Sequence, residues 1–464
     1  MGFLDKLAAW LEKHFLPVAG AIGRQKHLAA MRDGFIAILP MTMMGALVVM
    51  LNNVLFNADS LFGKMLNKMG WYAGSVQPFL AKYIIPVMSQ IWWGTLALGV
   101  IFSVFTISYN LAKNYEVDGL SAGVIATVSY LTLLPQTAKI ELAKDVAEKA
   151  GVKAVEGWGL LSWTSFNSSA VFTGLITAIL ATEIYRLVIK KGWVIKMPEQ
   201  VPPAVSKAFS AVIPGGIVML VFGILSVIFL NFVKLPLKDW IDITIQRPLT
   251  SLGQSPATMI FLVMISQILW FFGLHGMNIV GPILDTMYAP AMQENLQAVT
   301  VYGTTPPNAI TRNFVDVYAM HGGSGATLGL IICIYLFSKR QEHKELAKLA
   351  TAPGIFQINE PVIYGLPMVL NPIMFIPFVL TPVITLFIAW LFTGPIPFAG
   401  RIYIATPWVT PPVISAFLST GGSITATIVA AATLLLSILI YAPFVIVSNK
   451  DAVVEEESGN SLNV

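Results

Sequence analysis

Charge is scarce in this sequence, and its scarcity identifies the solvent. Only 11% of the residues are charged, whereas 56% are hydrophobic; an average soluble domain carries roughly a quarter charged residues. So few charges do not cover the surface of a water-soluble chain of 464 residues. We therefore expect lipid to be the main solvent. The net charge of +4 is ordinary for loops that face anionic lipid and gives no indication of nucleic-acid binding.

Cysteine and histidine are also rare. The one cysteine, Cys333, lies in the apolar run 331–335, and the chain has five histidines. These numbers exclude a disulfide framework within the chain and give no Cys/His metal cluster. We expect Cys333 to be a small buried hydrophobe rather than a reactive thiol. The sequence predicts no metal and no cofactor.

Three familiar segments are missing. A GxxxxGK[ST] nucleotide loop does not occur, so the chain is not itself an ATP-driven pump. No stretch outside the apolar runs is long enough for a folded catalytic domain. Charges interrupt residues 1–15, which excludes the apolar core of a cleavable signal. Leu4, Leu7, Leu11 and Phe15 share one helical face, a pattern typical of a helix lying at the membrane surface.

What the sequence has in abundance is long apolar runs. A helix crosses the hydrocarbon core with roughly 20 apolar residues, so this chain has room for about ten crossings, and unbroken runs favour helices over a barrel. The predicted spans are 34–56, 86–111, 119–135, 169–189, 211–233, 257–275, 322–338, 369–392 and 424–447. Three further apolar stretches, 276–310, 352–368 and 402–420, are broken by Pro, Gly and polar residues. Each is a span, a re-entrant hairpin or a buried loop.

Basic residues flank these spans unevenly. They precede the first span, follow the fourth, and follow the 322–338 run, although 139–156 also holds four lysines among acids. The positive-inside rule favours a cytoplasmic side for the three clusters. We predict a multi-pass membrane protein with both termini in the cytoplasm.

The broken segments gather in the second half of the chain. Residues 1–233 have regular spans, 234–450 hold nearly all the interruptions, and 451–464 form a polar tail. Interrupted helices expose backbone polar groups at membrane depth, which only protein or a wet cavity tolerates, and they mark transport sites. The sequence therefore predicts a scaffold in 1–233 and the functional site in 234–450.

Glu360 is the sharpest single signal. It lies in the broken segment 354–365, directly before Pro361. A carboxylate near membrane depth costs several kcal/mol unless it is paired or hydrated, so it is retained mostly where it binds something. Pro361 stops a regular helix and frees neighbouring backbone groups. An interfacial Glu in a loop explains the position equally well.

Two more candidates contain hydrogen-bonding or stacking groups. His275 ends the run 268–275 between two glycines, and Asn278 follows it; neutral imidazole both donates and accepts, which suits a sugar hydroxyl. Trp408 lies among prolines and threonines, where its indole can stack on a sugar ring. An interfacial role explains each residue too, and for His275 it is slightly favoured.

Other polar residues have structural explanations. Arg312 and Asp316 are four apart and pair on a helix. The glycines of 321–325 allow close packing of helices. Glu183 and Arg186 are expected to form an ion pair near a helix end.

The order of several motifs resembles one transporter family. The segment 34–40, with Met44-Gly45 and Asn52-Asn53 after it, is similar to the first span of EIIC sugar permeases of the lactose/cellobiose/diacetylchitobiose type, which belong to bacterial phosphotransferase systems. The segments 275–278 (His-Gly-Met-Asn) and 358–361 (Ile-Asn-Glu-Pro) match that family's two sugar-site motifs in order. The similarity covers residues 10–448, and Asn-Glu-Pro is its most specific part.

The resemblance implies an architecture and a site. The implied fold is an all-α polytopic membrane protein of the bacterial cytoplasmic membrane, with about ten transmembrane helices and two re-entrant hairpins. It forms a homodimer through its N-terminal spans, and the C-terminal domain carries one sugar per protomer. His275, Asn278, Asn359 and Glu360 are implied to hydrogen-bond the sugar, with Trp408 against its ring.

The resemblance also implies a function. The chain imports a β-linked disaccharide such as cellobiose, diacetylchitobiose or lactose, with a cellobiose-like β-glucoside favoured. A phosphocysteine on a separate EIIB protein then phosphorylates it, while Glu360 and His275 hold the accepting hydroxyl and move its proton. Whether the transport subunit counts as an enzyme stays open, because the donor cysteine lies on another protein.

Two other readings share the same hydropathy. One is an ion-coupled sugar permease in which Glu360 carries a proton, and the other is a membrane enzyme acting on lipid-linked sugar. Recovery of imported sugar in phosphorylated form separates them from the phosphotransferase reading.

Overall fold

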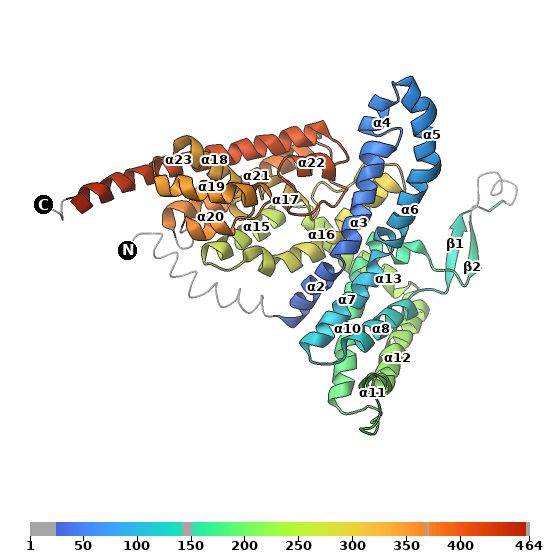
Figure 1. The fold of residues 1–464 in the computed structure, drawn as a ribbon. Helices are drawn as coiled ribbons and strands as arrows, with labels where there is room; N and C mark the ends of the chain where they lie inside the picture. Colours follow the sequence, from blue (N-terminus) through green and yellow to red (C-terminus); the bar gives the residue numbers. More distant parts are fainter. Residues whose placement is uncertain (1–24, 142–150, 153, 367, 369–370, 461–464) are drawn as a thin grey trace. The chain divides into compact units, whose positions relative to one another are not determined.

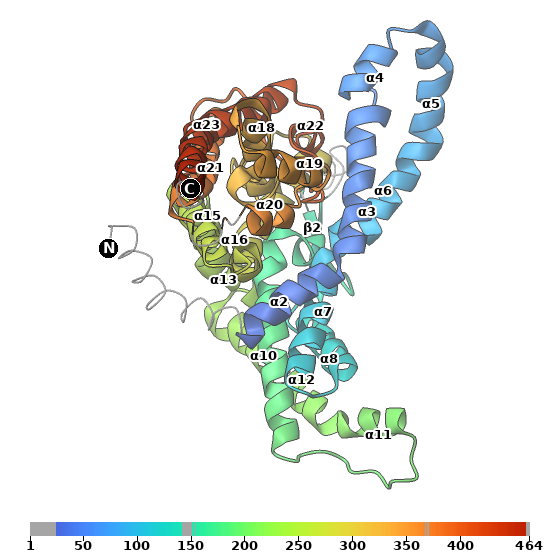
Figure 2. The same cartoon turned by 60° about the vertical axis from the view of Figure 1, so that its left-hand side comes forward.

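A computed structural model describes residues 25–141, 151–152, 154–366, 368 and 371–460, and they are mostly helical (Figures 1 and 2). The expected surface helix in 1–15 lies outside these residues. The last helix, α23 (Ile424–Asn460), continues through the first ten residues of the predicted polar tail.

Five described helices are long and apolar enough to cross a membrane: 72–114, 168–190, 203–233, 374–393 and 424–449. Two bent pairs, 26–37 with 40–53 and 237–253 with 256–271, raise the number to seven if each pair is one span; they bend by 50° and 74°. Two shorter apolar helices cover 119–132 and 324–337. Every predicted span overlaps one of these nine segments. The predicted fold class, a helical polytopic membrane protein with interrupted segments, is confirmed.

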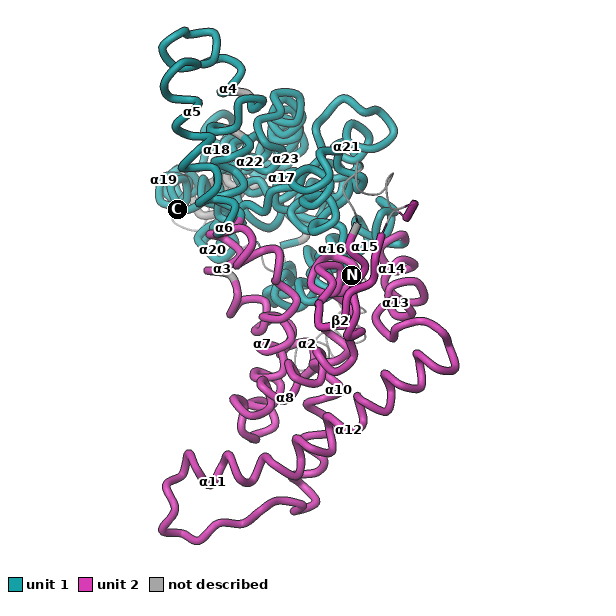
Figure 3. The backbone as a smooth tube through the Cα atoms, turned by 90° about the vertical axis from the view of Figure 1, so that its right-hand side faces the viewer, with its two compact units in different colours: residues 1–24, 46–90, 252–464 teal, residues 25–45, 91–251 magenta. Residues whose placement is uncertain are grey.

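Contacts divide the chain into two compact units (Figure 3). Unit 1 contains 1–24, 46–90 and 252–464, and unit 2 contains 25–45 and 91–251. The functional boundary expected at 233/234 stays a prediction, because compactness does not show which part carries sugar.

Unit 2 is built from packed apolar helices. Its elements are α2 (Lys26–Ala37), α7 (Gly99–Asn114), α8 (Gly119–Thr132), α10 (Val171–Lys190), α11 (Pro203–Ser210), α12 (Val212–Ile228), α13 (Leu237–Ile241), the single-turn helices Leu96–Leu98, Trp163–Ser165 and Ser168–Ala170, and the π-helical turns Phe229–Val233 and Asp242–Gln246. Val104, Ile107, Tyr130 and Phe222 are buried in its core. Gly34 of α2 lies so close to Ile107 of α7 that a Cβ would overlap it, so small residues set the helix spacing here.

A β-hairpin joins α8 to α10. Strands β1 (Thr137–Glu141) and β2 (Ala154–Trp158) are antiparallel. Lys139 of β1 lies opposite Glu156 of β2, and opposite charges at such positions attract each other. This lysine, one of the four that do not fit the positive-inside pattern, is therefore offset by an acidic residue across the hairpin.

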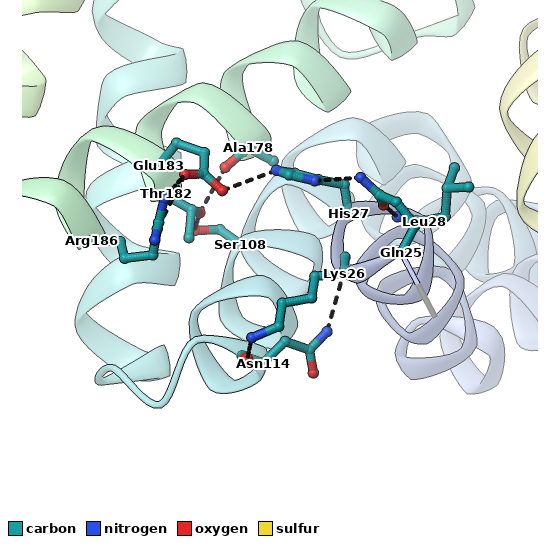
Figure 4. A network of polar contacts seen from close by, with 10 residues as sticks. All are labelled: Gln25, Lys26, His27, Leu28, Ser108, Asn114, Ala178, Thr182, Glu183 and Arg186. Atoms are coloured by element: carbon teal, nitrogen blue, oxygen red, sulfur yellow. Dashed lines mark hydrogen bonds and ion pairs between the residues drawn. The ribbon is translucent and has the colours of Figure 1, made fainter. Parts of the chain in front are cut away.

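One polar network ties three helices of unit 2 together (Figure 4). Arg186 donates to Glu183 at 2.7 Å, which confirms the predicted ion pair. Glu183 also bonds His27 of α2 at 2.9 Å, and the other ring nitrogen of His27 bonds the Gln25 amide at 2.7 Å. The Arg186 guanidinium lies over the Tyr115 ring, 4.2 Å from its centroid.

Unit 1 contains the interrupted segments. Its elements are α4 (Leu61–Leu66), α5 (Gln77–Phe79), α6 (Ile85–Gly94), α15 (Pro256–Phe271), α16 (Gly276–Thr300), α17 (Phe314–Tyr318), α18 (Thr327–Phe337), α19 (Gln341–Ile355), α20 (Glu360–Gly365), α21 (Pro372–Thr393), α22 (Ile414–Ser419) and α23, with the single turn Ser324–Ala326 and the π-helical turns Leu51–Phe56, Tyr72–Val76 and Leu80–Ile84. Helix α3 (Leu39–Met50) and helix α14 (Arg247–Gly253) cross the unit boundaries, as does α6, whose residues 91–94 belong to unit 2.

The three broken stretches fold differently. Most of 276–310 is the continuous helix α16, which contains Pro282 and Pro290. The 352–368 stretch is the end of α19, a turn and the short helix α20, and 402–420 is a loop followed by α22. Cys333 is fully buried in α18, as predicted, and its thiol donates to the Ile438 carbonyl at 2.8 Å.

Candidate functional site

Glu360 begins helix α20 and is half-buried. Pro361 occupies the next position, where its fixed φ suits a helix start and its missing N–H costs no hydrogen bond. Among the described residues, none forms a hydrogen bond or ion pair with the Glu360 carboxylate. The carboxylate therefore keeps its accepting capacity for a ligand or water.

His275 lies near this carboxylate. The structure places the two side chains close enough to interact electrostatically. His275 caps α16, because its Nδ1 accepts the Asn278 backbone N–H at 3.2 Å. In a neutral ring the hydrogen is then on Nε2, which is left as a donor. The imidazole is solvent-exposed and packs on Trp270, with ring centroids 4.3 Å apart.

The start of α16 is possible only because residue 276 is glycine. A Cβ there would lie 1.8 Å from the Ser266 carbonyl oxygen of α15. Gly273 in the preceding turn has φ +78°, which glycine adopts without strain. These two glycines bring His275 back over Trp270. Asn278, also exposed, follows in the first turn of α16.

Asn359 is buried rather than open to solvent, at 4% exposure. Its amide donates to the Ser324 carbonyl at 2.6 Å. Gly323, at φ +97°, lies so close that a Cβ would be 2.7 Å from the Asn359 side chain. The 321–325 glycines allow a close approach, as expected, but they lie in a turn at positive φ rather than in a packed helix. Gly323 packs against the segment that precedes Glu360.

Gln357 is a residue that the sequence reasoning missed. It is 4% exposed and has φ +67°. Its side-chain oxygen accepts the N–H groups of Gly322 and Gly323 at 3.2 and 3.4 Å. Its side-chain nitrogen donates to the carbonyls of Asp316 and Thr410, both at 3.2 Å. An amide two residues before Asn359 in a broken apolar segment was the available signal.

Trp408 lies in the loop before α22 and is 56% exposed. Side chains from other segments hold this loop by donating to its backbone carbonyls. Asn313 donates to the Thr406 carbonyl at 2.7 Å, and Gln357 donates to the Thr410 carbonyl. Trp408 is therefore linked to the Glu360 segment through Gln357.

Arg312 bonds two carboxylates. It donates to Asp316 at 3.2 Å, as predicted, and to Asp285 of α16, which the sequence reasoning did not find. The two ion pairs fix α16 to α17, and they engage the Nε and Nη1 groups of the guanidinium. This agrees with a structural role for the cluster.

Together these groups suit an uncharged ligand rich in hydroxyls. A carboxylate accepts, an imidazole donates, and an indole offers an apolar face, which is the usual chemistry of sugar recognition. No cluster of His, Cys, Asp and Glu able to hold a metal occurs within the described part of the chain.

Comparison with known proteins gives the same answer across the chain. The family model "Phosphotransferase system, EIIC" matches residues 32–382. The chain is 35% identical to the cellobiose-specific EIIC component of Lactococcus lactis subsp. lactis (strain IL1403), over 96% of this chain and 99% of that protein. It is 33% identical to the lichenan permease IIC component of Bacillus subtilis (strain 168), over 98% and 96%.

A solved structure extends the likeness to the fold. The crystal structure of ChbC, the IIC component of the N,N′-diacetylchitobiose-specific phosphotransferase system, matches with a TM-score of 0.86 and 31% identity. The match covers 97% of this chain and 99% of that one. The chain therefore belongs to the EIIC family of sugar-translocating, multi-pass membrane subunits of the phosphotransferase system.

Proposed function

We propose that this EIIC subunit imports a β-linked disaccharide, with a cellobiose-like β-glucoside as the favoured substrate. The observation that carries the proposal is the Glu360 carboxylate, which none of the described residues bonds and which is within electrostatic range of the His275 imidazole. The relatives described above are named for cellobiose, lichenan and diacetylchitobiose, which agrees with a β-linked sugar.

The site residues take complementary roles. Glu360 accepts from a sugar hydroxyl, and the Nε2–H of His275 donates to one. Asn278 offers an exposed amide in the same turn as His275, and Trp408 stacks on a sugar ring. Asn359 already donates one hydrogen to Ser324, so it contributes its remaining amide groups and holds the glycine turn.

Phosphorylation follows from alignment. A sugar hydroxyl oxygen attacks the phosphorus of a phosphocysteine on EIIB, so an O–P bond forms, the P–S bond breaks, and the thiolate stays on EIIB. The hydroxyl proton passes to Glu360, with His275 orienting the hydroxyl. Cys333 is buried in α18 and hydrogen-bonded to a carbonyl, so it is unsuited to receive the phosphoryl group.

Assembly and orientation belong to the same proposal. The subunit forms a homodimer through its N-terminal spans, and both termini lie in the cytoplasm, as the basic clusters favour. The turn between α18 and α19 is then cytoplasmic and is the proposed contact for EIIB.

The basic residues at the turn between α18 and α19 differ in whether an acidic residue pairs with them. Arg340 pairs with Glu342, whereas none of the described acidic residues forms an ion pair with Lys339 or Lys344. Burial lowers the pKa of His343, with Arg340 acting in the same direction, so this residue is neutral at pH 7. Lys339 and Lys344 are the candidate contacts for an acidic surface on EIIB.

Purified protein in liposomes tests the function. Alone, it should bind cellobiose without modifying it. Addition of phosphorylated EIIB should yield internal sugar phosphate, and Cys333→Ala should leave that yield unchanged.

A different outcome would overturn the proposal. If a proton gradient alone accumulates unmodified cellobiose, and Glu360→Gln abolishes this accumulation, the chain couples sugar to protons. Glu360 would then be a proton carrier.

A further inference from the structure

Four hydrogen bonds converge on one buried amide next to the proposed sugar site. Gln357 uses its oxygen for the backbone of Gly322 and Gly323, and its nitrogen for the backbone of Asp316 and Thr410. These partners belong to three segments: the end of α17, the glycine turn, and the loop that carries Trp408. All the hydrogen-bonding groups of the amide are engaged by these contacts.

Asp316 lies in the short helix α17, whereas the other two segments are not helical where Gln357 bonds them. Gly322 and Gly323 have φ values of +85° and +97°, and Thr410 lies in the loop before α22. Backbone groups outside helices need partners when they are buried or face a membrane protein's interior. Gln357 supplies such partners for all three segments at once.

The backbone of Gln357 is itself unusual. Its φ of +67° is in the left-handed region, which side chains other than Gly, Asn and Asp rarely adopt. Glycine would fit this conformation with less strain but would supply no amide. The hydrogen bonds of the Gln357 side chain therefore offset the strain of its left-handed backbone conformation.

We propose that Gln357 is a positioning residue, which fixes the Trp408 loop and the glycine turn relative to Asn359 and Glu360 so that both faces of the sugar are contacted together. The proposal rests on the sugar site proposed above. Gln357 is 4% exposed and acts through its neighbours rather than by touching the sugar.

A second buried glutamine provides a matched control. Gln267 of α15 accepts the Gly325 N–H at 2.8 Å and donates to the Ser266 hydroxyl at 2.9 Å. It holds the same turn from the other side. Among the bonds described, it has none to the loop that carries Trp408. Substitution of Gln267 therefore perturbs the glycine turn while leaving the hydrogen bond to the Trp408 loop in place.

Affinity measurements test the coupling. Gln357→Met keeps the side-chain length and removes all four hydrogen bonds, and it should weaken cellobiose binding about tenfold, as Trp408→Ala should. Combining the two should weaken binding little more than either alone, because both release the same contact. Gln267→Met combined with Trp408→Ala should give the product of the two single losses. Additive losses in the Gln357 cycle would overturn the proposal.

Hydrogen exchange without sugar tests the same inference independently. In Gln357→Met, amides of 405–413 should exchange at least several-fold faster than in the wild type, and in Gln267→Met they should not. Gln357→Gly also removes the hydrogen bonds, but it relieves the backbone strain and so is less prone to misfold. It should show the same faster exchange. Unchanged exchange in both Gln357 variants would overturn the positioning role. Wild-type protein that exchanges as expected but binds no cellobiose would overturn the proposed substrate instead.

Discussion

The two compact units satisfy their polar groups in different ways. Unit 2 relies on regular helices whose backbones are bonded internally, and the Glu183 network ties their side chains near one end (Figure 4). Unit 1 uses amide side chains to hold irregular backbone, as Gln357 does for the glycine turn and Asn295 does for Asn308 and Ile402. Unit 2 also holds backbone in this way, through Gln246 at the start of α10, so the units differ in emphasis rather than in kind. Irregular backbone is costly in a membrane protein, and unit 1 gains from it the arrangement of groups around Glu360.

The largest expected effect is on stability, when an ion pair is broken in one unit or the other. Arg312→Gln in unit 1 leaves the half-buried carboxylates of Asp285 and Asp316 without their common partner, and it should cost about 3 kcal/mol, the lower end of the range for a fully buried pair. Arg186→Gln in unit 2 leaves Glu183 bonded to His27 and should cost about 1 kcal/mol or less. Thermal unfolding in detergent measures both variants. Equal losses would show that the two units tolerate missing charge alike.

Glycine substitutions test the closest backbone contact in the site. Gly276→Ala forces a Cβ onto the Ser266 carbonyl and should cost up to about 3 kcal/mol through displaced backbone. Gly281→Ala in the same helix and Gly216→Ala in unit 2 meet no atom within 4 Å. These two should be neutral or stabilise by up to about 1 kcal/mol, since Ala favours helix. A Gly276→Ala protein with wild-type melting temperature would contradict the contact.

The next comparison is between one carboxylate in each unit, Glu360 and Glu183, and the property compared is the affinity for cellobiose. Glu360→Gln should keep the fold and weaken cellobiose binding by about one to two decades, because a hydrogen bond to a charged group contributes roughly 1.5–3 kcal/mol. Glu183→Gln in unit 2 should leave the affinity unchanged. Calorimetric titration of both variants decides, and an unaltered affinity in Glu360→Gln would remove that residue from the sugar site.

The smallest expected effect concerns the rate of partner docking. Lys339→Glu with Lys344→Glu should slow EIIB-dependent phosphorylation several-fold without changing sugar affinity, because exposed charges act mainly on association. Lys190→Glu with Lys191→Glu at the end of α10 is the control in unit 2. A slower rate in the control alone would move the docking surface to that unit.

The sequence predicted elements whose cause is local. Apolar length predicted the positions of the five to seven candidate spans and of the two shorter apolar helices. Spacing predicted the ion pairs of Arg312 with Asp316 and of Glu183 with Arg186. Pro282 and Pro290 pointed to a broken 276–310 segment, but the structure accommodates both within α16. Neighbouring protein can compensate for the hydrogen bonds that proline removes, and no sequence pattern reveals those neighbours.

Features that depend on distant partners were not predicted. Asp285 is 27 residues from Arg312, and Gln357 bonds backbone groups up to 53 residues away. Neither spacing has a period that a helix or strand would produce. The site's named residues came from motif resemblance, while the side chains that hold them became visible only in three dimensions.

The burial of Cys333 has a practical consequence for labelling the protein. Its thiol is shielded by α18 and bonded to the Ile438 carbonyl, so maleimide reagents should leave the native protein unlabelled. The natural chain thus already serves as a cysteine-silent background. A single reporter thiol introduced at an exposed position away from the sugar site would therefore carry a fluorophore alone, without prior removal of the native cysteine.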